Sequence, residues 1–196
     1  MNENPVTSVG GGVDLSDCPS PHSLRNRLLR LVWDWAWLLL FRPSPRLLYG
    51  WRNFLLRSFG ARVGKGVKVY PSAKIWAPWN LVMENYSCLA DHVDCYAVDR
   101  ILIGANVTVS QYSYLCAASH DYTRPTLPLT TAPITIGAGA WIAADVFIGP
   151  GVMVGEGAVV GARSTVVKAV DPWMVVAGNP ARNIKPRVLA QPAARS

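Results

Sequence analysis

Histidine, charged residues and paired cysteines are scarce in this chain of 196 residues. Only 16% of the residues are charged while 51% are hydrophobic, which excludes general disorder. The four cysteines form no C-x-x-C pair, so neither a zinc ribbon nor a thiol redox motif is expected. Since no signal peptide is recognisable, we expect reduced thiols and a cytoplasmic location.

Several common motifs are also missing. The apolar run 31–41 is interrupted by Asp34 and is shorter than the roughly 20 residues that cross a bilayer. There is no G-x-S-x-G elbow and no cysteine next to a histidine, so a covalent nucleophile is not indicated. No Walker or G-x-G-x-x-G loop occurs, because the glycines follow a different spacing.

That spacing is a repeat of six residues. A branched aliphatic residue occupies every sixth position at Ile136, Ile142, Ile148, Val154, Val160 and Val166. A helix would scatter these side chains, whereas short strands joined by turns return them to one wall. The same phase occurs over 63–75 and 103–115, with slippage over 81–102. The period predicts a parallel β-helix, an all-β solenoid whose successive coils pair about 4.8 Å apart.

The repeat divides the chain into four expected parts. Residues 1–19 are expected to be a disordered tail, 20–60 a helical segment, 61–180 the solenoid and 181–196 a C-terminal extension. Within the solenoid, 119–135 breaks the repeat and is predicted to form an extruded loop. Ser20 and Pro21 predict a helix start, and Pro43 predicts its end.

Excess positive charge is confined to the helical segment. Residues 24–62 carry eight arginines and one acid, whereas the rest of the chain has eleven bases and eleven acids. One face of the predicted helix is apolar and consists of Leu24, Leu28, Leu31, Trp35 and Leu38. Two compatible interpretations remain open: residues 24–42 cap the open end of the solenoid, or they lie on an anionic membrane surface. Nucleic acid is not an expected partner, because the later basic residues form no stripe with interleaved aromatics.

His120 is the candidate general base. It lies at the mouth of the loop, which three prolines stiffen, and an imidazole titrates near neutrality. The alternatives are an exposed loop histidine without a role and a competing site at His92. Asp121 is a weak candidate for orienting the ring, because adjacent residues on extended backbone point to opposite faces. That role falls to Asp94, Asp99 or a backbone carbonyl.

Four motifs carry a resemblance to a known family, namely YGWRNFLLRSFGA at 49–61, LCAASHDY at 115–122, GAWIA at 139–143 and AGNPAR at 177–182. Over about 45–187 the chain resembles the left-handed β-helix hexapeptide-repeat O-acetyltransferases. It is most similar to the branch proposed for colanic acid (exopolysaccharide) biosynthesis and is related to the maltose and galactoside O-acetyltransferases. Hexads are shared by several activities, but the His-Asp loop followed by Trp141 and a Gly-Asn-Pro-Ala end is specific for acyltransferases.

The resemblance implies roles for individual residues, with His120 as the catalytic base. The substrate-binding set that it implies is Trp141, Asp121 and Tyr96. The coenzyme A set that it implies is Ala143 and Ala162 along a groove, with Arg182 and Lys185 at the phosphates. The chain departs from the family at Ala97, Val167 and Ala169, where relatives often have Asn, Thr and Asp. These departures put one acceptor contact and the adenine end of the coenzyme site in doubt.

The expected function is transfer of an acetyl group from acetyl-CoA to a sugar hydroxyl, in exopolysaccharide or other cell-surface glycan biosynthesis. The resemblance implies a homotrimer with active sites between subunits, no metal, and direct transfer in a ternary complex. Backbone N–H groups, or the hydroxyl of Ser113 or Ser119, would hold the oxyanion. The saccharide acceptor is expected at the inner face of the cytoplasmic membrane, in free or lipid-linked form.

Two other functions are weighed against this one. A catalytically silent assembly scaffold would bind no thiol cofactor. A zinc enzyme resembling the γ-class carbonic anhydrases would need three converging histidines, and the repeat region offers only His92 and His120.

Overall fold

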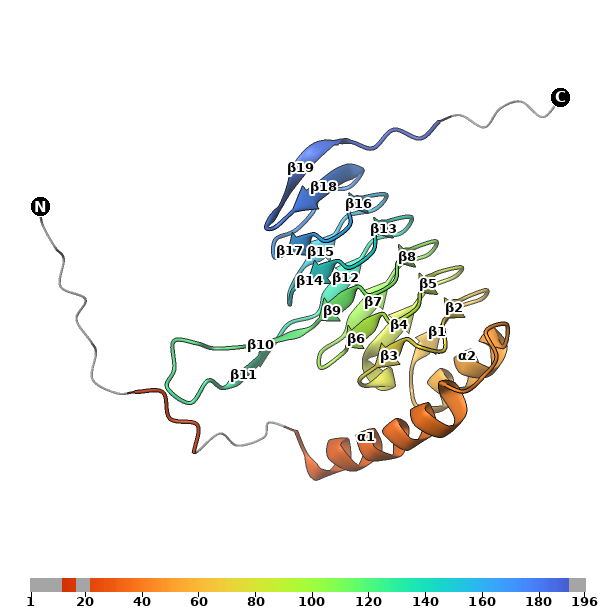
Figure 1. Ribbon diagram of the computed structural model, residues 1–196, viewed down its shortest axis with the longest axis vertical. Helices are drawn as coiled ribbons and strands as arrows, with labels where there is room; N and C mark the ends of the chain where they lie inside the picture. Colours follow the sequence, from red (N-terminus) through yellow and green to blue (C-terminus); the bar gives the residue numbers. More distant parts are fainter. Residues whose placement is uncertain (1–11, 17–21, 191–196) are drawn as a thin grey trace, which may run out of the picture.

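The computed structural model describes residues 12–16 and 22–190 of the chain. Three parallel sheets, here called walls A, B and C, form a solenoid of about six turns (Figure 1). The predicted fold class, a parallel β-helix with an N-terminal helical segment and an extruded loop, is confirmed. Most of the predicted tail 1–19 and the end of the predicted extension 181–196 lie outside the described residues.

The walls are built from short strands that occupy the same place in successive coils. Wall A contains β1 (Arg62–Val63), β4 (Leu81–Met83), β7 (Ile101–Ile103), β12 (Ile134–Ile136) and β15 (Met153–Val154). Wall B contains β2 (Lys68–Val69), β5 (Cys88–Leu89), β8 (Thr108–Val109), β13 (Trp141–Ile142), β16 (Val159–Val160), β18 (Met174–Gly178) and β19 (Ala181–Pro186). Wall C contains β3 (Lys74–Ile75), β6 (Asp94–Tyr96), β9 (Tyr114–Cys116), β14 (Phe147–Ile148) and β17 (Thr165–Val166).

The aliphatic residues of the repeat form the core. Ile136, Ile142 and Ile148 are completely buried, and the next three members of the series are at most 2% exposed. Each strand bonds to the strand of the next coil, as in the pairing of Ile142 with Val109 on one side and Val160 on the other. The stack therefore satisfies the backbone while it buries two small or branched side chains per hexad.

The repeat is interrupted mainly at one corner of the prism, where the chain passes from wall C to wall A. Here the first coil adds a 3₁₀ turn, η2 (Pro78–Asn80), and the third coil adds a hairpin of β10 (Ala118–His120) and β11 (Leu129–Thr131). The predicted slippage over 81–102 is therefore not an irregular stretch: 81–96 form regular strands, and the extra residues lie at the corners. The hairpin is the long arm that leaves the solenoid in Figure 1.

The helical segment lies across the end of the solenoid formed by the first coil (Figure 1). It contains α1 (Leu24–Ala36), a π-helical turn η1 (Trp37–Phe41) and α2 (Tyr49–Ser58). The helix begins after Ser23, whose hydroxyl accepts the N–H of Asn26 at 3.2 Å, rather than at the predicted Ser20–Pro21, which lies outside the described residues. The predicted end before Pro43 agrees with the last helical residue, Phe41.

The opposite end of the solenoid is closed by a hairpin. A tight turn with a cis peptide bond between Asn179 and Pro180 reverses the chain, and β19 then pairs antiparallel with β18. The boundary predicted at residue 180 falls inside this hairpin, so 181–186 belong to wall B rather than to a separate extension.

Candidate active site

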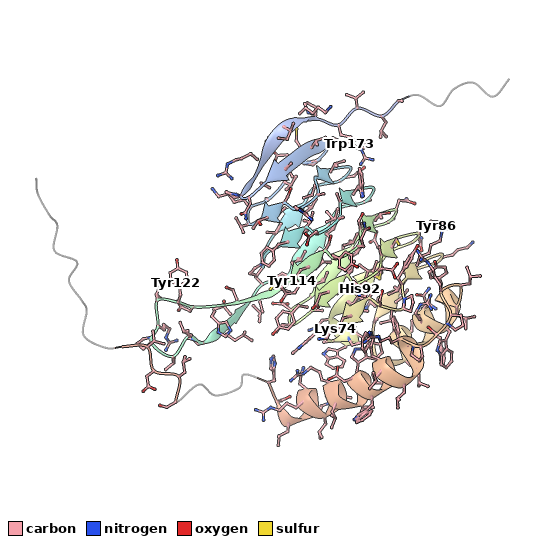
Figure 2. All side chains as sticks on the ribbon, in the orientation of Figure 1. Lys74, Tyr86, His92, Tyr114, Tyr122 and Trp173 are labelled. Atoms are coloured by element: carbon pink, nitrogen blue, oxygen red, sulfur yellow. The ribbon has the colours of Figure 1, made fainter. Side chains whose placement is uncertain are left out.

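The β10–β11 hairpin carries His120 at its outer end. Three residue pairs, from Ala118 with Thr131 to His120 with Leu129, hold the two arms in antiparallel register. Residues 121–128 then reverse the chain, and Tyr122, 87% exposed, lies near the far end of the arm (Figure 2). The hairpin thus presents an exposed histidine on a paired backbone rather than on a loose loop.

The imidazole of His120 is held by a backbone carbonyl. Its Nδ1 lies 2.6 Å from the oxygen of Leu127. Because a carbonyl oxygen only accepts, Nδ1 must carry the proton, which leaves Nε2 unprotonated in the neutral ring. Of the three predicted orienting groups, the structure selects a backbone carbonyl over Asp94 and Asp99. An accessible Nε2 lone pair is what a general base requires.

Asp121 does not face the imidazole of His120. Its carboxylate accepts the N–H and the hydroxyl of Thr123, at 3.0 and 2.6 Å. These hydrogen bonds lower the pKa of the Asp121 carboxyl below its ordinary value. The carboxylate therefore caps the turn of the loop. Any contact between Asp121 and a substrate would have to be made from this place in the loop.

The prediction that the Ser113 hydroxyl could hold the oxyanion is wrong. Ser113 is completely buried, and its hydroxyl donates to the carbonyl of Ala143 at 2.9 Å and accepts the N–H of Val146. The residue faces the interior because it lies four positions after the core residue Val109, where the hexad places small inward side chains. Ser119, the other candidate, is exposed on β10 beside His120.

An aromatic stripe runs along wall C toward the base of the hairpin, and it consists of Trp76, Tyr96, Tyr114 and Phe147. Successive ring centroids are 5.5, 6.2 and 5.6 Å apart, and each residue is half-buried. Burial is also the main reason that the pKa of the Tyr114 phenol is raised. Only Tyr96 was predicted as a site residue; aromatic residues at corresponding places in successive coils are the sequence signal for the others.

Trp141 lies on another wall. It is on β13 of wall B, where its ring is 47% exposed and its indole N–H donates to the Ser110 hydroxyl at 3.0 Å. His120, by contrast, projects from the corner between walls C and A. A single chain therefore does not bring Trp141 and His120 to one face of the solenoid.

The predicted coenzyme residues gather on the Trp141 side. Ala143 and Ala162 follow the wall B strands of adjacent coils, at the corner that leads to wall C. Arg182 and Lys185 are exposed on β19, the outermost strand of wall B. A small cavity of about 40 Å³ lies between Arg182 and 166–170, including the two predicted departures at Val167 and Ala169. Small side chains and two exposed cations thus share one end of wall B; the Arg182 guanidinium donates to the carbonyl of Ala181 at 3.0 Å.

His92 occupies a turn instead of a site with His120. It adopts a φ of 56°, and its ring stacks on Tyr112 of the next coil with centroids 5.1 Å apart. Figure 2 shows His92 on the body of the solenoid, apart from the hairpin arm that ends at Tyr122. The competing site predicted at His92 is therefore separate from the candidate base.

Metal and thiol chemistry find little support in the part of the chain that the structure describes. Within 12–16 and 22–190, no three His, Cys, Asp or Glu side chains are grouped closely enough to hold a metal ion. Cys95 is completely buried, and burial raises the pKa of its thiol.

Comparisons with known proteins agree with this geometry. Residues 133–168 match the family described as Bacterial transferase hexapeptide (six repeats). The proposed colanic acid biosynthesis acetyltransferase WcaF of Escherichia coli K12 is 44% identical over 177 residues, which cover 89% of this chain and 97% of WcaF. The chain belongs to the hexapeptide-repeat acetyltransferase family. The predicted family and the predicted enzyme class are confirmed.

Solved structures of the same family have the same fold. A galactoside acetyltransferase in complex with coenzyme A superimposes with a TM-score of 0.78 at 26% identity, over 85% of this chain and 84% of that protein. The acetyltransferase VCA0836 of Vibrio cholerae, complexed with acetyl coenzyme A, gives 0.77 at 26% identity, over 85% and 91% of the two chains. The likeness extends well beyond 133–168, to most of the solenoid.

Proposed function

We propose that this acetyltransferase moves an acetyl group from acetyl-CoA to a hydroxyl of a saccharide, with His120 as the general base. The observation that carries the proposal is the 2.6 Å contact between His120 Nδ1 and the Leu127 carbonyl, which leaves Nε2 free to accept a proton. The relatives add the substrate classes: WcaF is named for colanic acid biosynthesis, and the two solved relatives hold coenzyme A or acetyl coenzyme A.

The reaction proceeds in one ternary complex. His120 Nε2 takes the hydroxyl proton while the sugar oxygen attacks the thioester carbonyl carbon, which forms a C–O bond and a tetrahedral oxyanion. Backbone N–H groups stabilise this oxyanion, whereas Ser119 precedes His120 on β10 and its side chain points to the opposite face of the strand. The C–S bond then breaks, and the imidazolium returns the proton to the departing coenzyme A thiolate. The products are an O-acetyl sugar and free coenzyme A.

Two surfaces supply the substrates. Acetyl-CoA lies along the corner lined by Ala143 and Ala162, where small side chains expose the backbone, and its phosphates meet Arg182 and Lys185. The saccharide lies near the hairpin base, where Tyr96 and Tyr114 offer half-buried ring faces on which the apolar face of a sugar ring stacks.

The active site is completed by a second copy in a homotrimer. His120 lies at the corner between walls C and A, and Trp141 and the coenzyme residues lie on and beside wall B, so one chain cannot join them. An antiparallel hairpin arm that leaves the solenoid has the shape needed to reach the wall of a neighbour. In a cyclic trimer the same pair of surfaces meets three times.

Subunit mixing tests this arrangement. We expect His120→Ala and the Arg182→Ala, Lys185→Ala double variant each to turn over little at limiting acetyl-CoA. After unfolding and refolding together in equal amounts, their trimers should regain about a quarter of the wild-type activity, because each site then draws its base and its coenzyme contacts from different copies. No recovery from mixed trimers of verified composition would contradict a shared site.

An acceptor panel tests the activity itself. Acetyl-CoA consumption would be measured with mono-, oligo- and lipid-linked sugars, and the product examined by NMR for an O-acetyl ester. Transfer to a sugar hydroxyl supports the proposal. A protein that neither binds nor consumes acetyl-CoA would be a silent scaffold, and acetylation of an amine instead of a hydroxyl would overturn the proposed acceptor class.

A further inference from the structure

The continuous helix formed by α1 and the π-helical turn η1 has two apolar faces, and the solenoid covers only one of them. Trp33 and Phe41 are completely buried against the first coil. The indole N–H groups of Trp33 and Trp37 donate to the carbonyls of Ile75 and Ala73, at 2.6 and 2.9 Å. These two bonds fix the rotation of the helix about its own axis, so the other face cannot turn inward.

The face that points away from the solenoid, here called the outer face, is exposed along its whole length. It consists of Leu24, Leu28, Leu31, Val32, Trp35, Leu38 and Leu39, whose exposure ranges from 48 to 74%. The predicted apolar face is thus real, but it is not the face that caps the solenoid. An amphipathic helix normally turns such a face toward a core or a membrane.

The apolar surface continues onto α2. The indole N–H of Trp51 donates to the carbonyl of Leu40 at 2.9 Å, and the Trp51 ring stacks on Phe54. Both rings are more than a third exposed, as are Leu47 and Leu48 in the connection before α2. An exposed apolar surface of this length is unusual for a monomeric domain and marks an interaction site.

Two of the eight arginines over 24–62 hold the helices to the solenoid. Arg52 is completely buried and donates to the carbonyls of Val69, Pro45 and Arg46, and Arg57 donates to the carbonyl of Val63. Part of the local positive charge is therefore structural.

Arg25 and Arg27, near the start of α1, are not used in this way. At 3.6 residues per turn they lie on opposite flanks of the outer face, about 100° and 60° from Leu24. Both are exposed, and within the described residues neither guanidinium is hydrogen-bonded or ion-paired. Only one acid, Asp34, lies in α1.

We propose that the outer face is a membrane-docking surface, which enters the headgroup region of an anionic bilayer at the inner face of the cytoplasmic membrane. The side chains of its Leu residues and Trp35 enter the interface, and Arg25 and Arg27 contact lipid phosphates on either side. Arginines that flank an apolar strip complement a bilayer surface, because the lipid headgroups are anionic and the acyl chains beneath them are apolar. Among the helices of the described residues, none is both long enough and apolar enough to cross a bilayer.

Docking of this kind extends the proposed function, because it would present the enzyme to lipid-linked saccharides. The docking face and the candidate base lie on separate elements, α1 and the β10–β11 hairpin. Loss of one therefore need not affect the other, and the two proposals can fail independently.

Vesicle flotation tests the docking surface, with phosphatidylcholine vesicles that contain or lack phosphatidylglycerol. We expect binding to rise with the anionic lipid and fall with salt. Arg25→Gln with Arg27→Gln should weaken partitioning roughly 25-fold, about fivefold per arginine. Leu28→Gln, Leu31→Gln and Trp35→Gln together should weaken it at least about a hundredfold, since each apolar side chain leaves the interface.

Matched controls separate docking from folding and assembly. Lys65→Gln with Arg100→Gln removes the same charge from exposed positions of the solenoid, outside α1 and outside the predicted coenzyme residues, and should leave vesicle binding unchanged. Light scattering should give the same oligomeric state for all variants, and acetyl transfer to a soluble acceptor should be retained. Vesicle binding that is indifferent to the outer-face variants overturns the proposal. Dissociation of the assembly in those variants would instead identify the outer face as a contact between copies.

Discussion

The walls of the solenoid and the β10–β11 hairpin are both built from short strands but have opposite properties. In the walls, Ile142 and Ile148 are completely buried, and Ser113, a polar side chain turned inward, is hydrogen-bonded. In the hairpin, His120 and Tyr122 are exposed, and hydrogen bonds to Leu127 and within the turn hold the loop. Stability and chemistry are thus assigned to different parts of the chain, and substitutions should separate them.

The largest expected effect is on activity, at His120. Removing a general base typically costs about 100- to 10,000-fold in rate, and we expect His120→Ala to lose activity within that range. Because the side chain is exposed, the melting temperature should stay within the scatter of the wild type. The matched control is His92→Ala, which should retain most activity. If His92→Ala were inactive and His120→Ala nearly normal, the active centre would lie at the earlier coil instead.

The walls should respond in the reverse sense. Leu115→Ala removes a completely buried side chain from wall C, and large-to-small core changes of this type cost about 2–5 kcal/mol. Tyr122→Ala, at the exposed end of the hairpin, should change stability by no more than about 0.5 kcal/mol. Chemical denaturation of the two variants measures the contrast. Equal losses in both would mean that the hairpin is part of the folding core.

The periodic walls were predictable from sequence because a period of six fixes which side chains face inward. The same rule, applied to Ser113 four positions after Val109, already excludes it as an oxyanion group. The contact between His120 and the Leu127 carbonyl was not predictable, since it depends on the register of a hairpin that breaks the repeat.

The orientation of α1 could not be predicted for a different reason. Its sequence is apolar on two faces, so the pattern does not distinguish the face that packs from the face that remains exposed. The indole N–H groups of Trp33 and Trp37 donate to carbonyls of the first coil, and these two hydrogen bonds determine which face packs. They depend on where the folded coil places those carbonyls. Local periodicity carries no information about such contacts between a helix and a distant strand.

The smallest expected effect compares one residue type in the two regions. On wall C, burial raises the pKa of Asp94 above the ordinary 3.8, whereas in the hairpin the hydrogen bonds from Thr123 lower that of Asp121. Ionised Asp94 therefore opposes folding at neutral pH, and this penalty disappears below pH 3.8. Asp121 has the opposite sign: its contribution is present above pH 3.8 and is lost as the pH falls through its lower folded pKa.

Thermal melts as a function of pH measure this difference. Asp94→Asn should raise the melting temperature at neutral pH and leave it unchanged in acid, because the amide carries no charge to desolvate. Asp121→Asn should lower it slightly at neutral pH, since an amide oxygen accepts the Thr123 hydrogen bonds more weakly than a carboxylate does. Carboxyl titration by NMR provides the direct check. If both carboxyls titrated on the same side of 3.8, burial in the walls and hydrogen bonding in the hairpin would not be the separate influences described here.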